Sequence, residues 1–214
     1  MRSRSLALAV LALLAGSPAL FGQNQATHHA GPVAAKPSKA TVLTPAQQIA
    51  GAVAAAPQEM REGATVLGYD AGGVLGLLRK GTNDIVCLAD DPKDDQFHTA
   101  CYHKSLEPFM ARGRELLAQG VKGSARDSVR NAEIVSGKIK MPAAAALYTL
   151  TGPVSSFNPT TGKVSDEAKP LRSIYVPFAT AASTGVSEKP SKYLPWIMLP
   201  GTAKAHIMIG AHEM

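Results

Sequence analysis

The apolar positions of this chain follow a helical spacing in some stretches and alternate like strands in others. The first helical stretch begins at Thr44, a residue type that caps helices, and Pro45 suits the first helical position. Ile49 and Val53 then lie four residues apart and place an apolar stripe on one side. We therefore predict a short, alanine-rich helix that ends near Pro57 and depends on docking for its stability.

Three short strand-like runs come next, separated by turns that contain glycine. Residues 64–69 and 74–79 are rich in apolar side chains, and the segment 70–73, Asp-Ala-Gly-Gly, is typical of a hairpin turn. A second turn at 80–83 precedes a third run at 84–88. The pattern predicts a three-stranded antiparallel meander at the N-terminal end of the domain.

Helical spacing returns in the middle of the chain. A helix is expected over residues 106–119, with Ser105 as its cap and Gly120 as its end. A second helix is expected to begin at Ser124, followed three residues later by Asp127 in the manner of a capping box, and to end at Gly137. The charged residues of this second helix are expected to form a solvated face: Arg126, Arg130 and Glu133.

The C-terminal part of the chain is strand-like again. The predicted strands are 145–151, 171–178, 196–199 and 205–209, and a loop rich in Pro, Gly and Asn separates the first two. Strands at both ends with helices between them indicate an α+β domain over residues 44–214. We predict an antiparallel sheet, made of the N-terminal meander and the C-terminal strands, with three helices packed on it.

Residues 1–22 have the pattern of a secretory signal peptide. Arg2 and Arg4 precede an uninterrupted apolar run of ten residues, and small residues that suit cleavage follow. This run is shorter than the roughly 20 residues needed to span a bilayer, and no later stretch is apolar enough. Residues 23–43 are rich in Ala, Pro, Gln and Ser, which is typical of a flexible linker. We therefore expect an exported protein, either periplasmic or extracellular.

The basic composition does not indicate nucleic-acid binding. The formal net charge is +6, but two arginines lie in the expected signal peptide and two lysines in the expected linker. Subtracting these four leaves about +2 on the folded domain, which is too little for the basic footprint of a nucleic-acid-binding protein. We expect no nucleic-acid partner and no membrane span, and the partner classes left open are an envelope protein and a small-molecule ligand.

Cys87 and Cys101 are the two cysteines of the chain. In an exported protein they meet an oxidising compartment without a third thiol to compete, so we predict one structural disulfide. Their spacing is not C-x-x-C, so a thioredoxin-like redox motif is absent. The polar segment between them is expected to be a loop that this bond holds in place.

The segment around the cysteines also holds most of the candidate metal ligands. Asp94 and its acidic neighbours, together with His98 and His103, offer the carboxylate and imidazole groups that bind calcium, zinc or iron. Their spacing matches neither an EF-hand loop nor the H-E-x-x-H motif, so a solvated acidic turn is the simpler interpretation. His206 lies in an apolar run, where it suits either a structural role or a third ligand. No cofactor is expected, and a divalent metal at these residues is the exception left open.

Four sequence segments carry a resemblance to other proteins. GATVLGYD, NDIVCLADDP, FHTACYHKSLEPFMARGREL and PWIMLPGTAKAHIMI together resemble a group of uncharacterised exported bacterial proteins. The resemblance covers roughly residues 44–214 and implies export and a shared fold. It implies no activity and no catalytic residue.

These observations favour a small structural or binding module over an enzyme. The chain has neither the G-x-S-x-G nor the S-x-x-K motif of acyl-transfer enzymes, and its glycines do not form a dinucleotide-binding pattern. The expected role is that of a module of the bacterial envelope or secretome. The alternative is a metal-assisted hydrolase that uses His98, His103 and His206, and it requires these three side chains to converge in a concave site.

Overall fold

The first helix begins where the sequence predicts it. In helix α1 (Pro45–Val53), the Thr44 hydroxyl accepts a hydrogen bond from the Gln47 backbone amide, and the Gln47 side chain accepts one from Thr44 N. This capping box satisfies two amides that the helix would otherwise leave without partners. The structure, a computed structural model, describes residues 42–210, so the expected signal peptide and most of the expected linker lie outside the described residues.

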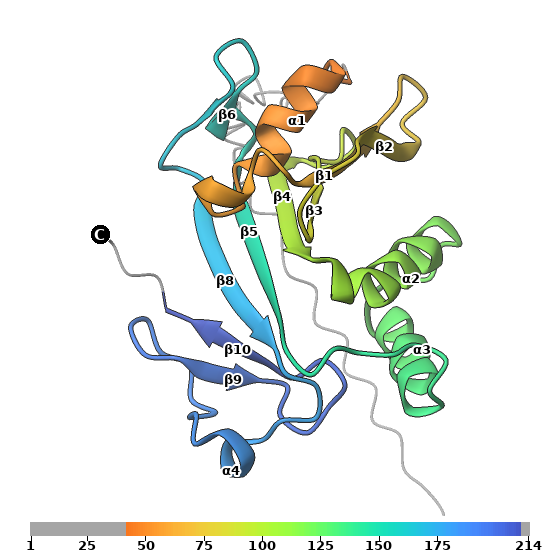
Figure 1. The fold of residues 1–214 in the computed structure, drawn as a ribbon, viewed down its shortest axis with the longest axis vertical. Helices are drawn as coiled ribbons and strands as arrows, with labels where there is room; N and C mark the ends of the chain where they lie inside the picture. The colour runs from red at the N-terminus through yellow and green to blue at the C-terminus, as the bar shows by residue number, and fades with distance from the viewer. Residues whose placement is uncertain (1–41, 211–214) are drawn as a thin grey trace, which may run out of the picture. The chain divides into compact units, whose positions relative to one another are not determined.

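A mixed, mostly antiparallel sheet of eight strands organises residues 42–210, in the order β2-β1-β3-β4-β5-β8-β10-β9 (Figure 1). Its strands are β1 (Thr65–Tyr69), β2 (Leu75–Arg79), β3 (Ile85–Leu88), β4 (Gln96–His103), β5 (Ala145–Pro153), β8 (Lys169–Tyr175), β9 (Trp196–Met198) and β10 (His206–Ile209). The strands β6 (Phe157–Asn158) and β7 (Lys163–Val164) pair with each other as a separate hairpin. With the helices α1, α2 (Glu107–Ala118) and α3 (Gly123–Val135) packed on the sheet, the predicted α+β class is confirmed.

The predicted hairpin between β1 and β2 is confirmed. The Asp70 carboxylate accepts hydrogen bonds from the backbone amides of Gly72 and Val74, at 2.8 and 2.9 Å, and fixes the turn. Gly73 has a φ of 73°, a left-handed conformation in which a Cβ atom is costly. The strands that follow are antiparallel, as a hairpin requires.

The predicted meander is wrong in its strand order. β3 does not pair with β2; it lies on the other side of β1 and runs parallel to it. To reach that position the chain crosses the start of β1 within a few residues, and the amides of Thr82 and Asn83 both donate to Gly63 O there. Gly81 makes this crossing feasible, because a Cβ atom on it would lie 2.3 Å from the backbone nitrogen of Thr65.

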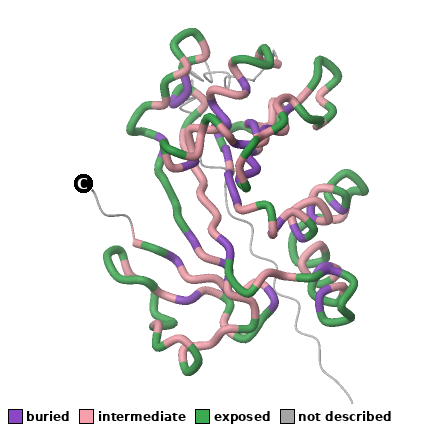
Figure 2. The backbone as a smooth tube through the Cα atoms, in the orientation of Figure 1, coloured by how far each residue is buried: buried purple, intermediate pink, exposed green. Residues whose placement is uncertain are grey.

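Alternation along the central strands divides the core between the two faces of the sheet. Val86 and Tyr102 are buried in a cluster with residues of α2 and α3, whereas their neighbours Cys87 and Cys101 are buried in a cluster with Ala52 of α1. Side chains of successive strand residues point to opposite faces, so each central strand serves both clusters. Figure 2 shows the buried residues concentrated where β3 and β4 pass beside α1.

Helices α2 and α3 occur as predicted, but their caps differ from the prediction. Ser105 does not cap α2; it lies in a short 3-10 turn (Lys104–Leu106) that precedes the helix, and its backbone amide donates to His103 Nδ1 at 3.3 Å. Ser124 does not cap α3, whose N-cap is Lys122. The glycine ends are as predicted, because Gly120 and Gly137 have φ values of 80° and 77°.

Arg130 is buried, contrary to the expected solvated face of α3. Its side chain is 7% exposed, and its guanidinium carbon lies 4.0 Å from the centre of the Phe109 ring. Arg130 Nη2 donates to Asp127 at 2.7 Å, and Lys204 Nζ donates to the other oxygen of the same carboxylate at 2.8 Å. The buried cation therefore joins α2, α3 and the loop before β10 through an aromatic ring and an ion pair.

The predicted C-terminal strands are confirmed as β5, β8, β9 and β10. The antiparallel register pairs Ala145 with Tyr175, and Tyr175 in turn with His206. None of the helices within residues 42–210 has the length and apolar content to cross a membrane.

Candidate functional site

The segment expected to be a polar loop between the cysteines is largely a strand. Residues 89–95 form a turn, and β4 follows with Phe97, Thr99 and Cys101 buried on alternate positions. This alternation of Phe97, Thr99 and Cys101 is present in the sequence, beside acidic residues and histidines that are also typical of a metal site. The expectation of a loop with little apolar area was therefore wrong.

The predicted disulfide between Cys87 and Cys101 is present. The two cysteines are directly opposite each other on the antiparallel strands β3 and β4, and both are fully buried beneath α1. The bond therefore links two strands that already pair through their backbones. Its surroundings are those of a structural disulfide, because neither sulfur is accessible to a thiol in solution.

His98 and His103 lie at the two ends of β4. The His98 ring lies beside the Thr151 hydroxyl, with Nδ1 at 2.8 Å, and the residue is exposed. His103 Nδ1 lies 2.8 Å from the Ser105 hydroxyl, and its Nε2 lies 3.8 Å from an Asp84 carboxylate oxygen. The two histidines are five positions apart on one strand, so they point to opposite faces of the sheet and about 17 Å of strand lies between them.

His206 has a different and largely structural environment. Its ring stacks on Tyr175 with a centroid distance of 5.1 Å, and its Nδ1–H donates to Lys204 O at 2.7 Å. Burial lowers the pKa of His206, because desolvation disfavours the imidazolium. Two strands, β5 and β8, lie between β10 and β4, so three strand spacings of about 4.8 Å separate His206 from the other histidines.

The structure does not bring the candidate metal ligands together. Asp94 lies in the exposed turn before β4, where its carboxylate accepts a hydrogen bond from the Asp95 amide at 2.8 Å. Across residues 42–210, no three His, Cys, Asp or Glu side chains are grouped so that they could hold a metal ion. The hydrolase hypothesis thus lacks the convergence of His98, His103 and His206 that it requires.

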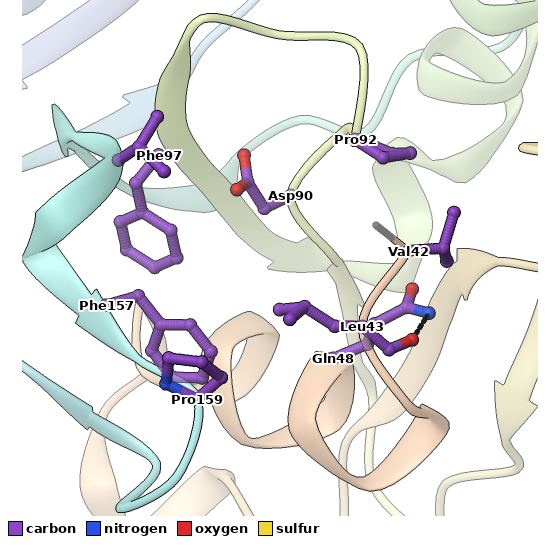
Figure 3. Close-up of a pocket in the computed structure, with 9 residues that line it drawn as sticks. Val42, Leu43, Gln48, Asp90, Pro92, Phe97, Phe157 and Pro159 are labelled. Atoms are coloured by element: carbon purple, nitrogen blue, oxygen red, sulfur yellow. Dashed lines mark hydrogen bonds between the residues drawn. The ribbon is translucent and has the colours of Figure 1, made fainter. Parts of the chain in front are cut away.

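An apolar pocket forms where the chain enters the domain. Figure 3 shows Phe97 and Phe157 on one side, Val42 and Pro92 on the other, and Leu43 between them. The pocket has a volume of about 190 Å³. Small-molecule sites typically measure roughly 300–1,000 Å³, so this pocket suits an apolar group of side-chain size. Its remaining lining residues are Gln48, Asp90, Val154 and Pro159.

The aromatic wall of the pocket is built by contacts between distant segments. The rings of Phe97 (β4) and Phe157 (β6) stack with centroids 5.4 Å apart and planes 10° from parallel. Phe157 also lies against α1 at Gly51, where a Cβ atom would come within 3.3 Å of the ring. Both rings are almost fully buried, so the wall is fixed by packing before any ligand enters.

Two polar residues, Gln48 and Asp90, line the pocket. Gln48 is committed to the fold: its amide nitrogen donates to Leu43 O and Tyr69 O, both at 2.8 Å, and its oxygen accepts from Tyr69 N at 2.7 Å. Asp90 accepts a hydrogen bond from the His98 amide at 2.9 Å and supplies the negative charge of the lining. The pocket therefore combines apolar walls with one acidic residue.

No local feature of the sequence indicates this pocket. Its lining comes from two parts of the chain besides the turn before β4 and β4 itself: the segment that leads into α1 with the helix, and the region from the end of β5 through β6. These parts are far apart in the chain. Two of its residues, Val42 and Leu43, fall in the stretch that was expected to be linker. No family model, no curated protein and no solved structure matches this chain.

Proposed function

We propose that this protein is an exported binding module of the bacterial envelope or secretome, and that its pocket at Phe97 and Phe157 holds an apolar group of a partner or ligand. The observation that carries the proposal is a hollow with fixed aromatic walls and a single acidic lining residue. Concave apolar sites with few convergent polar groups are the usual form of ligand sites. The buried disulfide supports export, because such bonds persist in oxidising compartments.

The size of the pocket determines what it can contribute to binding. Burial of one leucine-sized side chain contributes about 1.5–3 kcal/mol. A dissociation constant of 1 mM already requires about 4.1 kcal/mol, so the pocket alone does not give tight binding. It acts as an anchor for one group of a larger ligand, and the rest of the affinity comes from contacts around its rim.

The charge of Asp90 sets the expected preference among small probes. Among molecules that carry the same hexyl chain, hexylamine should bind better than hexanol, and hexanol better than heptanoate. The binding is measured by amide chemical-shift changes in the full chain, with the shifts expected at residues that line the pocket. Asp90→Asn should reduce the difference between the amine and the carboxylate.

A filled pocket provides the decisive comparison. Val154→Trp places a large side chain at the lining and should abolish the shifts caused by hexylamine. The matched control is Val135→Trp, which adds the same bulk at a position 69% exposed on α3. If the Val154 variant folds and still responds to hexylamine like the unsubstituted chain, the pocket is not the binding site and the proposal fails.

A further inference from the structure

A second hollow, larger and of opposite charge, lies on the face of the sheet that α1 partly covers. It occurs where the end of α1 and the β6–β7 hairpin meet β5 and β8 (Figure 1), and its volume is about 710 Å³. Residues 54–57 and Arg61 form one wall, residues 162–166 form the other, and strands β5 and β8 form the floor. We call this hollow the basic groove.

The floor of the basic groove pairs an aromatic with a cation. Tyr148 on β5 is directly opposite Arg172 on β8, so both side chains share one face of the sheet. Directly opposed residues have Cβ atoms about 4.5–5.5 Å apart, so these two side chains start from adjacent points on the floor. Cys101 lies on the other side of Tyr148 in the same row, and its disulfide holds this part of the floor rigid.

Three cations from three different elements line the groove. The side chains of Arg172 and Lys163 form no ion pair or hydrogen bond within the described part of the chain, and both residues are exposed. Arg61 donates to the backbone carbonyls of Ala56 and Ala54 at 2.9 and 3.0 Å, contacts that position it without neutralising its charge. Asp166 is the one acidic residue among the lining residues, so the groove carries a net positive charge.

The arrangement contrasts with the other charged surface of the domain. On α2, the cations Arg112 and Arg114 each have an acidic partner within 3.1 Å. Cations that lack such a partner inside a hollow produce an attractive potential for anions, because the low-dielectric walls focus the field. The groove therefore differs from a solvated, self-neutralised face.

We propose that the basic groove binds an acidic oligosaccharide, a chain of sugar units that bear carboxylates. Its cations are spread over both walls and the floor, which suits repeated charges better than a single phosphate group. The Tyr148 ring offers a surface for a sugar ring, and Ser165 and Asp166 offer partners for hydroxyl groups.

An extended acidic peptide fits the groove less well than an oligosaccharide. Both floor strands are already paired on each side, β5 with β4 and β8, and β8 with β5 and β10. The floor therefore presents no free strand edge to which a peptide could add by backbone hydrogen bonds. Recognition has to come from side chains, which is the usual situation for a ligand rich in hydroxyl groups.

The test uses the full chain and a fluorescein-labelled oligogalacturonate, with fluorescence anisotropy as the readout. Binding is expected at low salt and should weaken as the salt concentration rises, because the groove charges are exposed to solvent. The Lys163→Gln/Arg172→Gln double variant should lose affinity by about tenfold. The matched control is Lys122→Gln/Lys189→Gln, which removes the same charge from exposed positions outside the groove and should change affinity by less than about twofold.

Three results would overturn the proposal. Equal binding of the methyl-esterified oligosaccharide would show that carboxylates are not recognised. Tighter binding of a polyglutamate of the same charge would assign the groove to acidic peptides. An equal loss in the groove and control variants would show that only the net charge of the chain matters. Hexylamine binding at the apolar pocket should be unchanged in the groove variants, so failure here is separable from failure of the proposed function.

Discussion

The buried ion pair of α3 makes an asymmetric prediction about stability. Arg130 is almost entirely enclosed, its Nη2 is bound to Asp127, and its Nε has no partner within the described residues. Replacing Asp127 with asparagine leaves the guanidinium buried without its counter-ion. Loss of one partner of a buried pair costs about 3–5 kcal/mol, and because Asp127 is 36% exposed we expect about 2–3 kcal/mol here.

Replacing the cation should cost less than replacing its partner. Arg130→Met keeps an unbranched chain over the Phe109 ring, removes the desolvated charge and leaves Asp127 paired with Lys204. Loss of the contact with the ring costs about 1–2 kcal/mol, but the variant no longer has to bury a charge. The free energy of unfolding should therefore fall by about 1 kcal/mol. We therefore expect Asp127→Asn to be clearly more damaging than Arg130→Met.

Thermal unfolding at pH 7, followed by circular dichroism, measures both variants. For a domain of this size 1 kcal/mol corresponds to about 2–4 °C in melting temperature, so the Asp127 variant should melt about 5–10 °C below the unsubstituted chain. If Arg130→Met costs as much as Asp127→Asn or more, then the guanidinium is a net stabilising group, and the argument from desolvation is wrong.

The pH dependence offers an independent check on the same pair. Burial raises the pKa of Asp127, but hydrogen bonds from Lys204 and Arg130 outweigh it and hold this pKa below its usual value. A lowered carboxyl pKa gives stability that is complete above the unfolded value, about 3.9, and that is lost as the pH falls through the folded value. The stability gap between the unsubstituted chain and Asp127→Asn should therefore narrow as the pH falls below about 4.

Three further predictions concern other parts of the domain. The Cys87→Ala/Cys101→Ala double variant should lose about 3 kcal/mol, since the bond closes a loop of about 15 residues, and each single variant should cost nearly as much; urea midpoints that stay unchanged would contradict a structural role. Gly81→Ala should lower the melting temperature sharply because its Cβ would meet the β1 backbone, whereas Gly76→Ala, with nothing within 4 Å, should be nearly neutral. Burial lowers the pKa of His206, so its contribution to stability is present above the unfolded value of about 6.5 and is lost as the pH falls. His206→Phe should therefore show a weaker loss of stability between pH 7 and pH 5 than the unsubstituted chain.

Features set by neighbouring residues could be predicted from the sequence. The Thr44 cap of α1, the turn at Asp70 and Gly73 and the glycine end at Gly137 all depend on contacts within a few residues. These local preferences favour the same conformation as the final packing does, so the sequence around each residue is enough to predict it. The pairing of the two cysteines also followed from composition, since the chain offers no other pairing.

Features set by contacts across the chain could not be predicted in the same way. The parallel pairing of β1 with β3 requires the chain to cross β1 at Gly81. The need for glycine at this position becomes clear only from its close contact with the backbone of Thr65 in the folded structure. Arg130 has the residue type and spacing of a surface position, yet Phe109 from another helix encloses it. The apolar pocket joins Leu43, Phe97 and Phe157 from distant segments, and no spacing rule connects them.

The crossing at Gly81 implies an order of events during folding. Strands β1 and β2 form one hairpin and β3 and β4 another, and each can close over a short loop with a small entropic cost. A short turn cannot join the parallel strands β1 and β3, so their contact has to form when the two hairpins meet. Helix α1 contacts β1, β3 and β4 and so spans this seam. We expect the late, rate-limiting step to be the docking of the two hairpins beneath α1, with the disulfide already inside one of them.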